Sequence, residues 1–295
     1  MSITRPVILV GVDGSAADDI AIEWAAREAS MRALPLRIVH VLDTPTVPQM
    51  ITDDIAEQAL ARSGAMASEL VEQATGKAQS AAPGLEVRQE VRPGRVVEEL
   101  VKAATDARVL VLGSGQRFDP SRLGLGSVAT HVTSHAPCPV VVARTPAEGE
   151  PTAGPSAGRV VVGVDGSAAS ATAVAFAFDE ASWRRCDLTA VHAYTNLPDA
   201  WMVDARDPAE YERAAARVLA ETLAGWAERY PDVDVVTRLV AGRPVPALVE
   251  ESAGATLLVV GSHGHGWFAG MLLGSVSQAV LRHASVPVAV ARQAP

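Results

Sequence analysis

The stretch Val10-Gly11-Val12-Asp13-Gly14-Ser15 occurs a second time, unchanged, as Val162-Gly163-Val164-Asp165-Gly166-Ser167. Residues 113–144 and 261–292 also align without a gap, and 14 of these 32 positions are identical. A repeat at this distance indicates that one structural unit is written twice. The chain of 295 residues has room for two units of ordinary domain size. We expect domains at residues 1–147 and 159–295, joined at 148–158 by a linker rich in Pro, Gly and Ala.

Strands and helices are predicted to alternate within each unit. The apolar runs at 7–12 and 160–164 are rich in valine, which is typical of strands buried on both faces. Further strands are predicted at 36–42, 85–91, 109–112 and 139–143, with helices between them, and the second copy repeats this series. Ser15 is placed to cap the first helix, with Asp18 in its first turn. Such alternation requires right-handed crossovers, so we predict an α/β fold: two homologous doubly wound, Rossmann-like domains, each a five-stranded parallel sheet.

Composition and charge narrow the classes of function. The chain is 48% hydrophobic and 20% charged, with 25 basic and 34 acidic side chains and a net charge of −9. An acidic chain of this kind is not expected to hold phosphate backbones or anionic lipids, so we predict no nucleic-acid and no membrane partner. No apolar run approaches the roughly 18 residues of a membrane span. The two cysteines, Cys138 and Cys186, are read as buried reduced thiols, and a cytoplasmic location follows.

Two glycine-containing loops per unit fall at the carboxyl ends of predicted strands, where ligands of doubly wound sheets bind. In the second unit, one loop follows Asp165, and the other runs from Gly261-Ser262-His263-Gly264 through nine residues to Gly274-Ser275-Val276. A helix that begins after Gly and Ser offers free N–H groups and the positive end of its dipole to a phosphate. Neither a P-loop nor a GxGxxG dinucleotide motif is present. From the residues alone, an anion site and plain turn glycines both remain open.

The GxxG-x9-GS arrangement, the aspartate after the first strand and the histidine of the second strand resemble universal stress proteins. The resemblance extends over both halves and identifies the tandem type, with an adenine nucleotide α-hydrolase-like fold. Members with this motif bind ATP, so the resemblance implies ATP as the ligand, with or without Mg²⁺. Carried over to the second domain, it implies that Asp165 holds the ribose or the adenine edge and that Ala193 and Val260 flank the base. It assigns the phosphates to Gly261, Gly264, Gly274, Ser275 and Val276, with Ser277 close by.

The first domain matches most of this pattern. The matching positions are Asp13, Val41, Leu112, Gly113, Gly126, Ser127 and Val128. The domain departs from it at Gln116, which stands where the second domain has Gly264, and at Ala129, which stands where the second has Ser277. A side chain at Gln116 would crowd the phosphates or require an unfavourable φ. We therefore expect the second site to bind ATP more tightly than the first.

Histidines and single carboxylates of these loops allow other interpretations. His263 and His265 stand two residues apart, which suits a metal site, although no third ligand is placed beside them, and contact with phosphate is the alternative. His40 and His192, near the ends of the second strands, are interpreted as structural hydrogen-bond partners. Each site shows one acid, and neither a paired acid nor an activated nucleophile is evident. No catalytic and no metal-binding residue is therefore assigned.

Two classes of function follow from these observations. The first is an ATP-binding protein of stress response or growth regulation, which acts through nucleotide occupancy and contacts with an unidentified protein partner, with little or no turnover. The alternative is an enzyme such as an ATP hydrolase or adenylyl transferase. Each domain ends in an apolar strand whose exposed edge would invite pairing. We therefore expect the two domains to pair within the chain and the chain to form a homodimer.

Overall fold

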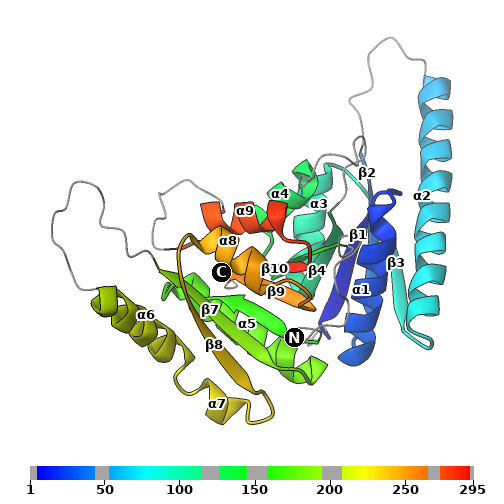
Figure 1. Ribbon diagram of the computed structural model, residues 1–295. Coiled ribbons are helices and arrows are strands. Elements are labelled where there is room, and N and C mark those ends of the chain that lie inside the picture. Colours follow the sequence, from blue (N-terminus) through cyan, green and yellow to red (C-terminus); the bar gives the residue numbers. More distant parts are fainter. Residues whose placement is uncertain are drawn as a thin grey trace, which may run out of the picture. The chain divides into compact units, whose positions relative to one another are not determined.

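The structure, a computed structural model, describes residues 5–43, 53–114, 126–144, 158–194, 208–264 and 273–292. The chain divides into two compact units, Met1–Ala143 and Arg144–Pro295 (Figure 1). Each unit contains five strands that run parallel to one another. None of the described helices is long and apolar enough to cross a membrane.

The first unit follows a strand–helix alternation from end to end. Its elements are β1 (Val7–Val12), α1 (Ala17–Met31), β2 (Leu36–Leu42), α2 (Asp53–Ala81), β3 (Val87–Pro93), α3 (Val96–Ala103), the 3-10 turn η1 (Ala104–Asp106), β4 (Ala107–Gly113), α4 (Ser127–His135) and β5 (Val140–Ala143). Its strands lie in the order β3-β2-β1-β4-β5. The first strand is central and fully buried, and Val10 pairs with Ile38 of β2 on one side and Val111 of β4 on the other.

The second unit repeats this plan with one addition. Its elements are β6 (Val160–Gly163), α5 (Ala168–Arg184), β7 (Leu188–Tyr194), α6 (Pro208–Leu223), α7 (Trp226–Arg229), β8 (Val235–Ala241), α8 (Pro244–Glu251), β9 (Leu257–Gly261), α9 (Ser275–His283) and β10 (Val288–Ala291). Its strands lie in the order β8-β7-β6-β9-β10, the same order as in the first unit. The one-turn helix α7 has no counterpart among the described residues of the first unit, and its Trp226 stacks on Phe178 of α5 at a centroid distance of 5.3 Å.

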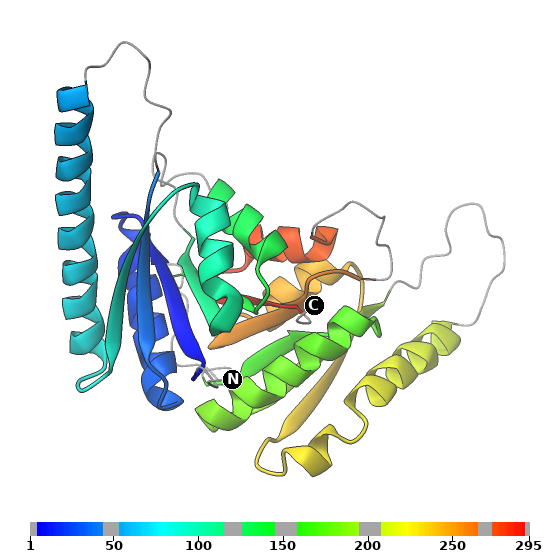
Figure 2. The ribbon, with the colours of Figure 1, turned by 180° about the vertical axis from the view of Figure 1, so that it is seen from behind.

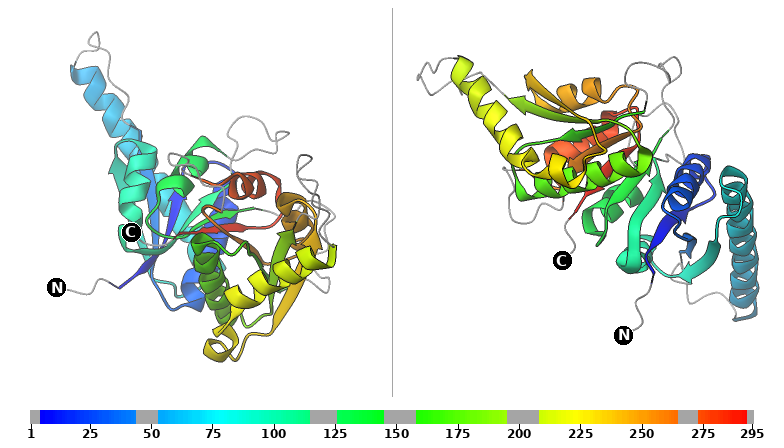
Figure 3. Two further views of the ribbon diagram at one scale, coloured as in Figure 1. Left: turned by 90° about the vertical axis from the view of Figure 1, so that its left-hand side faces the viewer. Right: turned by 90° about the horizontal axis from the view of Figure 1, so that it is seen from below.

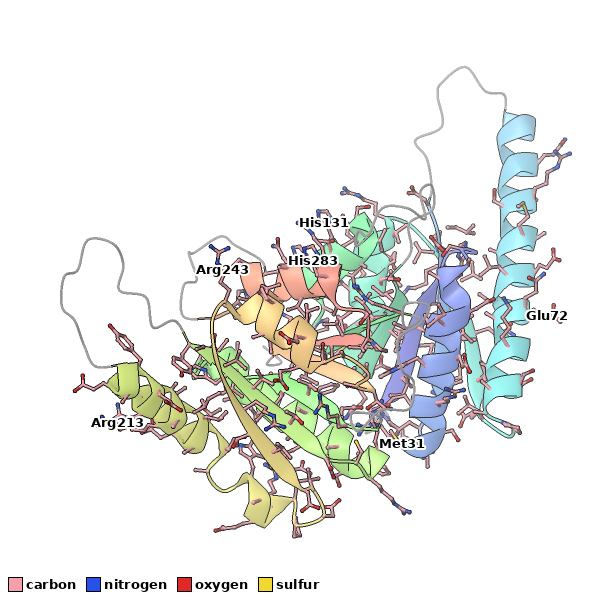
Figure 4. The ribbon with its side chains drawn as sticks, in the orientation of Figure 1. Met31, Glu72, His131, Arg213, Arg243 and His283 are labelled. Atoms are coloured by element: carbon pink, nitrogen blue, oxygen red, sulfur yellow. The ribbon has the colours of Figure 1, made fainter. Side chains whose placement is uncertain are left out.

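Helices cover both faces of each sheet. In the first unit, α1 and α2 pack together on one face and α3 and α4 on the other (Figures 1 and 2). In the second unit, α5 and α6 lie together on one face and α8 and α9 on the other, as the further views also show (Figure 3). Two labelled charged side chains, Glu72 of α2 and Arg213 of α6, project from the outer sides of their helices (Figure 4). Each unit is thus a three-layer sandwich, and the predicted fold class is confirmed.

Three local expectations differ from the structure. Ser15 makes no side-chain cap, because the carboxylate of Asp18 folds back onto the loop before α1, whereas Ser167 does cap α5 and accepts from the Ser170 amide at 3.1 Å. The third strand begins at Val87 rather than at residue 85, because the Leu85 amide still donates to Ala82 O in the turn after α2. The sequence pattern also contained no sign of α7.

Candidate functional site

A cavity of about 280 Å³ lies in the second unit at the carboxyl ends of β6, β7 and β9. The strand order reverses between β6 and β9, and ligands of doubly wound sheets bind at such switch points. The volume is just below the range of about 300–1,000 Å³ that is usual for small-molecule sites. The cavity is lined by Gly163, Val164, Asp165, Ser170, Val191, Ala193, Pro244, Leu248, Val260, Gly261, His263, Gly264, Gly274, Ser275, Val276 and Ser277.

Part of the cavity lining is apolar and part is polar, and the two parts come from different elements. Val191 and Ala193 of β7, with Pro244 and Leu248 of α8, give an apolar wall. The polar lining consists of the loop after β9 and the first turn of α9, which supply backbone amides, hydroxyls and the imidazole of His263. The cavity can therefore take a ligand with one flat apolar part and one polar or anionic part.

The start of α9 is held against the end of β9 by two hydrogen bonds. The Gly274 amide donates to Ser262 O at 2.8 Å, and the Ser277 hydroxyl donates to Gly261 O at 2.6 Å. Ser262 is only 5% exposed, and its hydroxyl is hydrogen-bonded to Nδ1 of His263 at 2.9 Å. These bonds bring the two ends of the glycine loop together, although residues 265–272 between them lie outside the described part of the chain.

The first turn of α9 has the backbone geometry that suits an anion. The amides of Ser275 and Val276 come before the first intrahelical bond, in which the Gln278 amide donates to Gly274 O at 3.0 Å. Amides in that position point out of the helix end, where the dipole is positive. The amide of Gly274 is different from its neighbours, since it is already used by Ser262 O.

Asp165 lies in the β6–α5 loop, beside Gly264 of the loop after β9. Its Oδ1 accepts from the Ser167 amide at 2.9 Å, and its own amide donates to Ser170 Oγ at 3.1 Å. Its Oδ2 would lie 2.5 Å from a Cβ added at Gly264. Gly264 therefore leaves space beside this carboxylate, and its φ is outside the left-handed region.

Glycines at two strand ends allow helices to come close. A Cβ at Gly261 would lie 2.8 Å from the backbone of Ala169, and a Cβ at Gly163 would lie 3.1 Å from both terminal methyls of Leu248. Gly113 of the first unit stands in the same relation to Ala17, at 2.8 Å. Glycine at these positions therefore allows the helices to pack closely against the strand ends, in addition to any contact with a ligand.

The second-strand histidines are structural hydrogen-bond partners, as predicted. Nδ1 of His192 lies 2.7 Å from Val164 O, and Nδ1 of His40 lies 2.8 Å from Val12 O. Because the partner is a carbonyl, Nδ1 must carry the proton in both cases. Each bond fixes the residue directly before the strand-end aspartate, Asp165 or Asp13.

In the first unit, the residues of the predicted site lie at the equivalent edge. Asp13 follows β1 directly, and the others lie on β2, the end of β4 and the start of α4: Val41, Leu112, Gly113, Gly126, Ser127 and Val128. Gln116 lies outside the described residues, as does His265 of the second unit. Ala129 is buried in the first turn of α4 and has no hydroxyl to give the bond that Ser277 gives to Gly261.

The unit-1 counterpart of Ser170 is a carboxylate. Asp18 is 7% exposed, and its Oδ2 accepts from the amides of Asp13 at 3.0 Å and Gly14 at 2.7 Å. Burial, followed by the neighbouring charges of Asp13 and Asp19, raises the pKa of Asp18 to about 6 in spite of these two bonds.

Several lining residues were not selected from the sequence. Pro244 and Leu248 stand four apart on α8, so their shared apolar face could have been found from helical spacing. Ser170 could have been found by comparing the two copies at the position of Asp18. Among the described residues, no group of three or more His, Cys, Asp or Glu could hold a metal ion.

Comparisons with known proteins agree with the repeat. The universal stress protein family matches residues 5–144 and again residues 157–292. A universal stress protein of Mycobacterium tuberculosis (strain ATCC 25618 / H37Rv) is 42% identical over 296 residues, which cover 97% of each chain. One of Mycolicibacterium smegmatis is 40% identical over 299 residues, which cover 99% of this chain and 98% of its own. The crystal structure of a universal stress protein from Archaeoglobus fulgidus has the same fold, with a TM-score of 0.69 at 21% identity, over 97% of this chain and 96% of that one.

Proposed function

Since the chain belongs to the universal stress protein family, we propose that it binds ATP and acts in stress response or growth regulation through nucleotide occupancy. In this proposal, occupancy changes contacts with a protein partner, and ATP undergoes little or no turnover. The observation that carries the proposal is the cavity at the β6–β9 switch point, which is lined both by apolar side chains of β7 and α8 and by the amino end of α9.

The lining residues fit the parts of ATP. Ala193, Leu248 and Val260 offer apolar surface to a base, and the Asp165 carboxylate can accept from a ribose hydroxyl or a base amino group. The amides of Ser275 and Val276 face an anion favourably. Glycine at 264 leaves the carboxylate of Asp165 room that a side chain would occupy.

A magnesium ion would enter as part of the nucleotide. Mg²⁺ keeps several waters and binds through one or two carboxylates together with substrate phosphates. Asp165 is the carboxylate among the lining residues of the described part of the chain, so it is the side chain that would meet such an ion. The ion would neutralise phosphate charge, and Asp165 would orient the nucleotide beside it.

The proposal is tested by measuring binding and turnover on the purified full chain. We expect ATP to bind, as read by isothermal titration, and to be recovered intact after overnight incubation. Ala193→Phe should weaken ATP binding by about tenfold or more, because the ring fills the wall of the cavity. The matched control is Ala171→Phe on the exposed side of α5, which should leave binding unchanged. Absence of ATP binding, equal effects of both variants, or many turnovers overnight would overturn the proposal.

We extend the proposal to assembly. Residues 148–158 act as the linker between domains at 1–147 and 159–295. Within its own unit, β5 pairs with β4, and β10 pairs with β9, so each final strand has an edge that its unit does not use. Apolar edges of this kind favour pairing, and we propose that the two domains pair in the chain and that the chain forms a homodimer. Light scattering that gives the mass of a monomer at all concentrations would contradict the dimer.

The thiols favour a reducing compartment, and we propose the cytoplasm. Cys138 and Cys186 are both free, the first buried and the second half-buried. Burial raises the pKa of the Cys138 thiol to about 12 and also raises that of Cys186. Both side chains therefore stay protonated and unreactive near neutral pH.

A further inference from the structure

One position of the site carries a hydroxyl in the second unit and a carboxylate in the first. Ser170 and Asp18 each stand five residues after the strand-end aspartate, in the first turn of the following helix. Each accepts the amide of that aspartate, at 3.1 Å from Asp165 and at 3.0 Å from Asp13. Both are buried, with 3% and 7% of their surface exposed. Both side chains therefore hold the amide of the strand-end aspartate, Asp18 also accepts the Gly14 amide, and the two side chains differ in charge.

This position belongs to the wall of the ligand cavity. In the second unit, Ser170 lines the cavity together with Asp165 and Gly264. The cavity there has one lining carboxylate and one neutral hydroxyl at this corner. In the first unit, the two equivalent positions are the carboxylates Asp13 and Asp18, and the charge of Asp13 acts on Asp18 closely enough to raise its pKa.

Charges around Asp18 come from several elements. Asp13 lies in the loop that Asp18 caps, and Asp19 is the next residue of α1. The Lys77 ammonium of α2 is paired with Asp19, so its charge is directed there. His40 of β2 donates to the carbonyl of the residue before Asp13. The charges of Asp13 and Asp19 both disfavour a second negative charge at Asp18, and a further anion placed beside these carboxylates is disfavoured in the same way.

We propose that this position selects ligands by charge. Ser170 admits the polyphosphate of ATP to the second site, whereas Asp18 makes the first site favour adenosine-class ligands with little or no negative charge. This inference rests on the proposed nucleotide function. It adds that the two sites of the chain prefer different ligands.

Reciprocal substitutions on the full chain separate charge from shape. The charge-changing variants are Ser170→Asp and Asp18→Asn, and Ser170→Ala removes the hydroxyl without adding charge. Binding of ATP and of adenosine is measured by isothermal titration without Mg²⁺ at pH 7.5 and pH 5. Thermal unfolding of each variant establishes that it is folded.

The expected effects follow from linkage. A polyphosphate that shifts the titration of the neighbouring carboxylate by one pH unit changes its own affinity about tenfold. At pH 7.5 we expect Ser170→Asp to weaken ATP at the tight site by about tenfold or more, and Ser170→Ala by less than about threefold. Asp18→Asn should strengthen ATP at the weak site by about tenfold. Adenosine should change by less than about threefold in every variant.

The change of pH gives an independent reading. In the wild type, ATP at the weak site should bind more tightly at pH 5 than at pH 7.5, because Asp18 becomes neutral below about pH 6. Asp18→Asn should lose this dependence, apart from the part that ATP itself contributes at both sites.

The outcomes distinguish the inference from the proposed function. If the wild type binds ATP but Asp18→Asn changes neither its affinity nor its pH dependence, position 18 does not select charge and the inference is wrong. The same holds if adenosine and ATP are weakened equally by Ser170→Asp. If the wild type binds no ATP at either pH, the proposed function fails first, and the inference falls with it. Should Ser170→Asp not fold, the Asp18→Asn arm decides alone.

Discussion

The two sites of this chain have the same scaffold and different linings. In both units, a histidine of the second strand holds the carbonyl before the strand-end aspartate, and a glycine ends the fourth strand against a helix. In both, a fully buried glutamate also pairs with an arginine one turn later in the first helix. The differences lie where a ligand would be: Asp18 against Ser170, Gln116 against Gly264, and Ala129 against Ser277. Positions that shape the sheet edge agree between the copies, and so do many that line the cavity, such as Asp13 with Asp165 and Gly126 with Gly274, so the two sites differ at a limited set of positions.

The largest effect should come from giving the second site the first site's residue at Gly264. A Cβ there would lie 2.5 Å from Asp165 Oδ2, so Gly264→Gln must move the carboxylate or the loop. If two charge-assisted hydrogen bonds to ATP are lost at about 2 kcal/mol each, affinity falls roughly a thousandfold. Isothermal titration of the full chain measures this loss.

A double variant identifies the cause of that loss. If the clash with the carboxylate is responsible, adding Asp165→Ala to Gly264→Gln should recover part of the affinity, relative to the sum of the single effects. Strictly additive effects would show that Gly264 acts through some other contact. If Gly264→Gln binds ATP as tightly as the wild type, the difference between Gly264 and Gln116 does not make the two sites unequal.

The next prediction concerns the stability of the folded chain. It depends on Asp18, for which the second unit has the uncharged Ser170. Its pKa is higher in the folded chain, about 6, than its ordinary value of 3.8, so the folded state binds this proton more tightly. The stabilisation is complete below about pH 4, is lost as pH rises toward about 6, and stays lost above it. Asp18→Asn should therefore raise the free energy of unfolding at pH 7.5 by up to about 3 kcal/mol, with little change at pH 4.

Urea unfolding of Asp18→Asn and of the wild type at several pH values measures this difference. Ser170→Asn in the second unit is the matched control, and it should not reproduce the pH dependence. If the free energies of unfolding of Asp18→Asn and the wild type differ by the same amount from pH 4 to pH 7.5, burial does not destabilise the charged form of Asp18.

A smaller effect is expected at Ser277. Its buried hydroxyl donates to Gly261 O, and Ser277→Ala copies Ala129 of the first unit. Loss of one such bond should cost about 1 kcal/mol of stability and loosen the start of α9, with a few-fold loss in ATP affinity. Ala129→Ser is the reciprocal variant and should have the opposite sign if its hydroxyl reaches Gly113 O. An unchanged midpoint of urea unfolding in Ser277→Ala would show that the bond contributes nothing.

The smallest difference is expected where the units agree. His40→Ala and His192→Ala each remove one hydrogen bond to a strand-end carbonyl, so each should cost about 1 kcal/mol. The two losses of unfolding free energy, measured in urea, should be equal within about 0.5 kcal/mol. A loss confined to one of the two variants would mean that the scaffolds are not equivalent.

The sequence was sufficient for the general position of the site. Strand-end residues could be assigned because valine-rich runs such as Val7–Val12 are followed directly by polar residues and glycine. A parallel sheet then places all carboxyl ends of the strands at one edge. Asp165, Gly264 and Ser275 were predicted in this way, and all three line the cavity. Pro244 and Leu248 were missed, because α8 reaches the cavity only through its packing beside β7 and Gly163, which no local pattern encodes.

By itself, the sequence determined the repeat, the α/β class and the sheet edge at which the cavity lies. These features depend on composition and local periodicity, and both occur in each of the two similar copies of the unit. The tertiary structure alone decided what individual residues do at that edge. It placed Asp165 against Gly264, turned the Gly274 amide toward Ser262 O, and made Asp18 a buried carboxylate rather than an exposed first-turn acid. These roles arise from loops of different strands that meet at one place, and from the loss of water around a charge. Neither is a property of neighbouring residues in the chain.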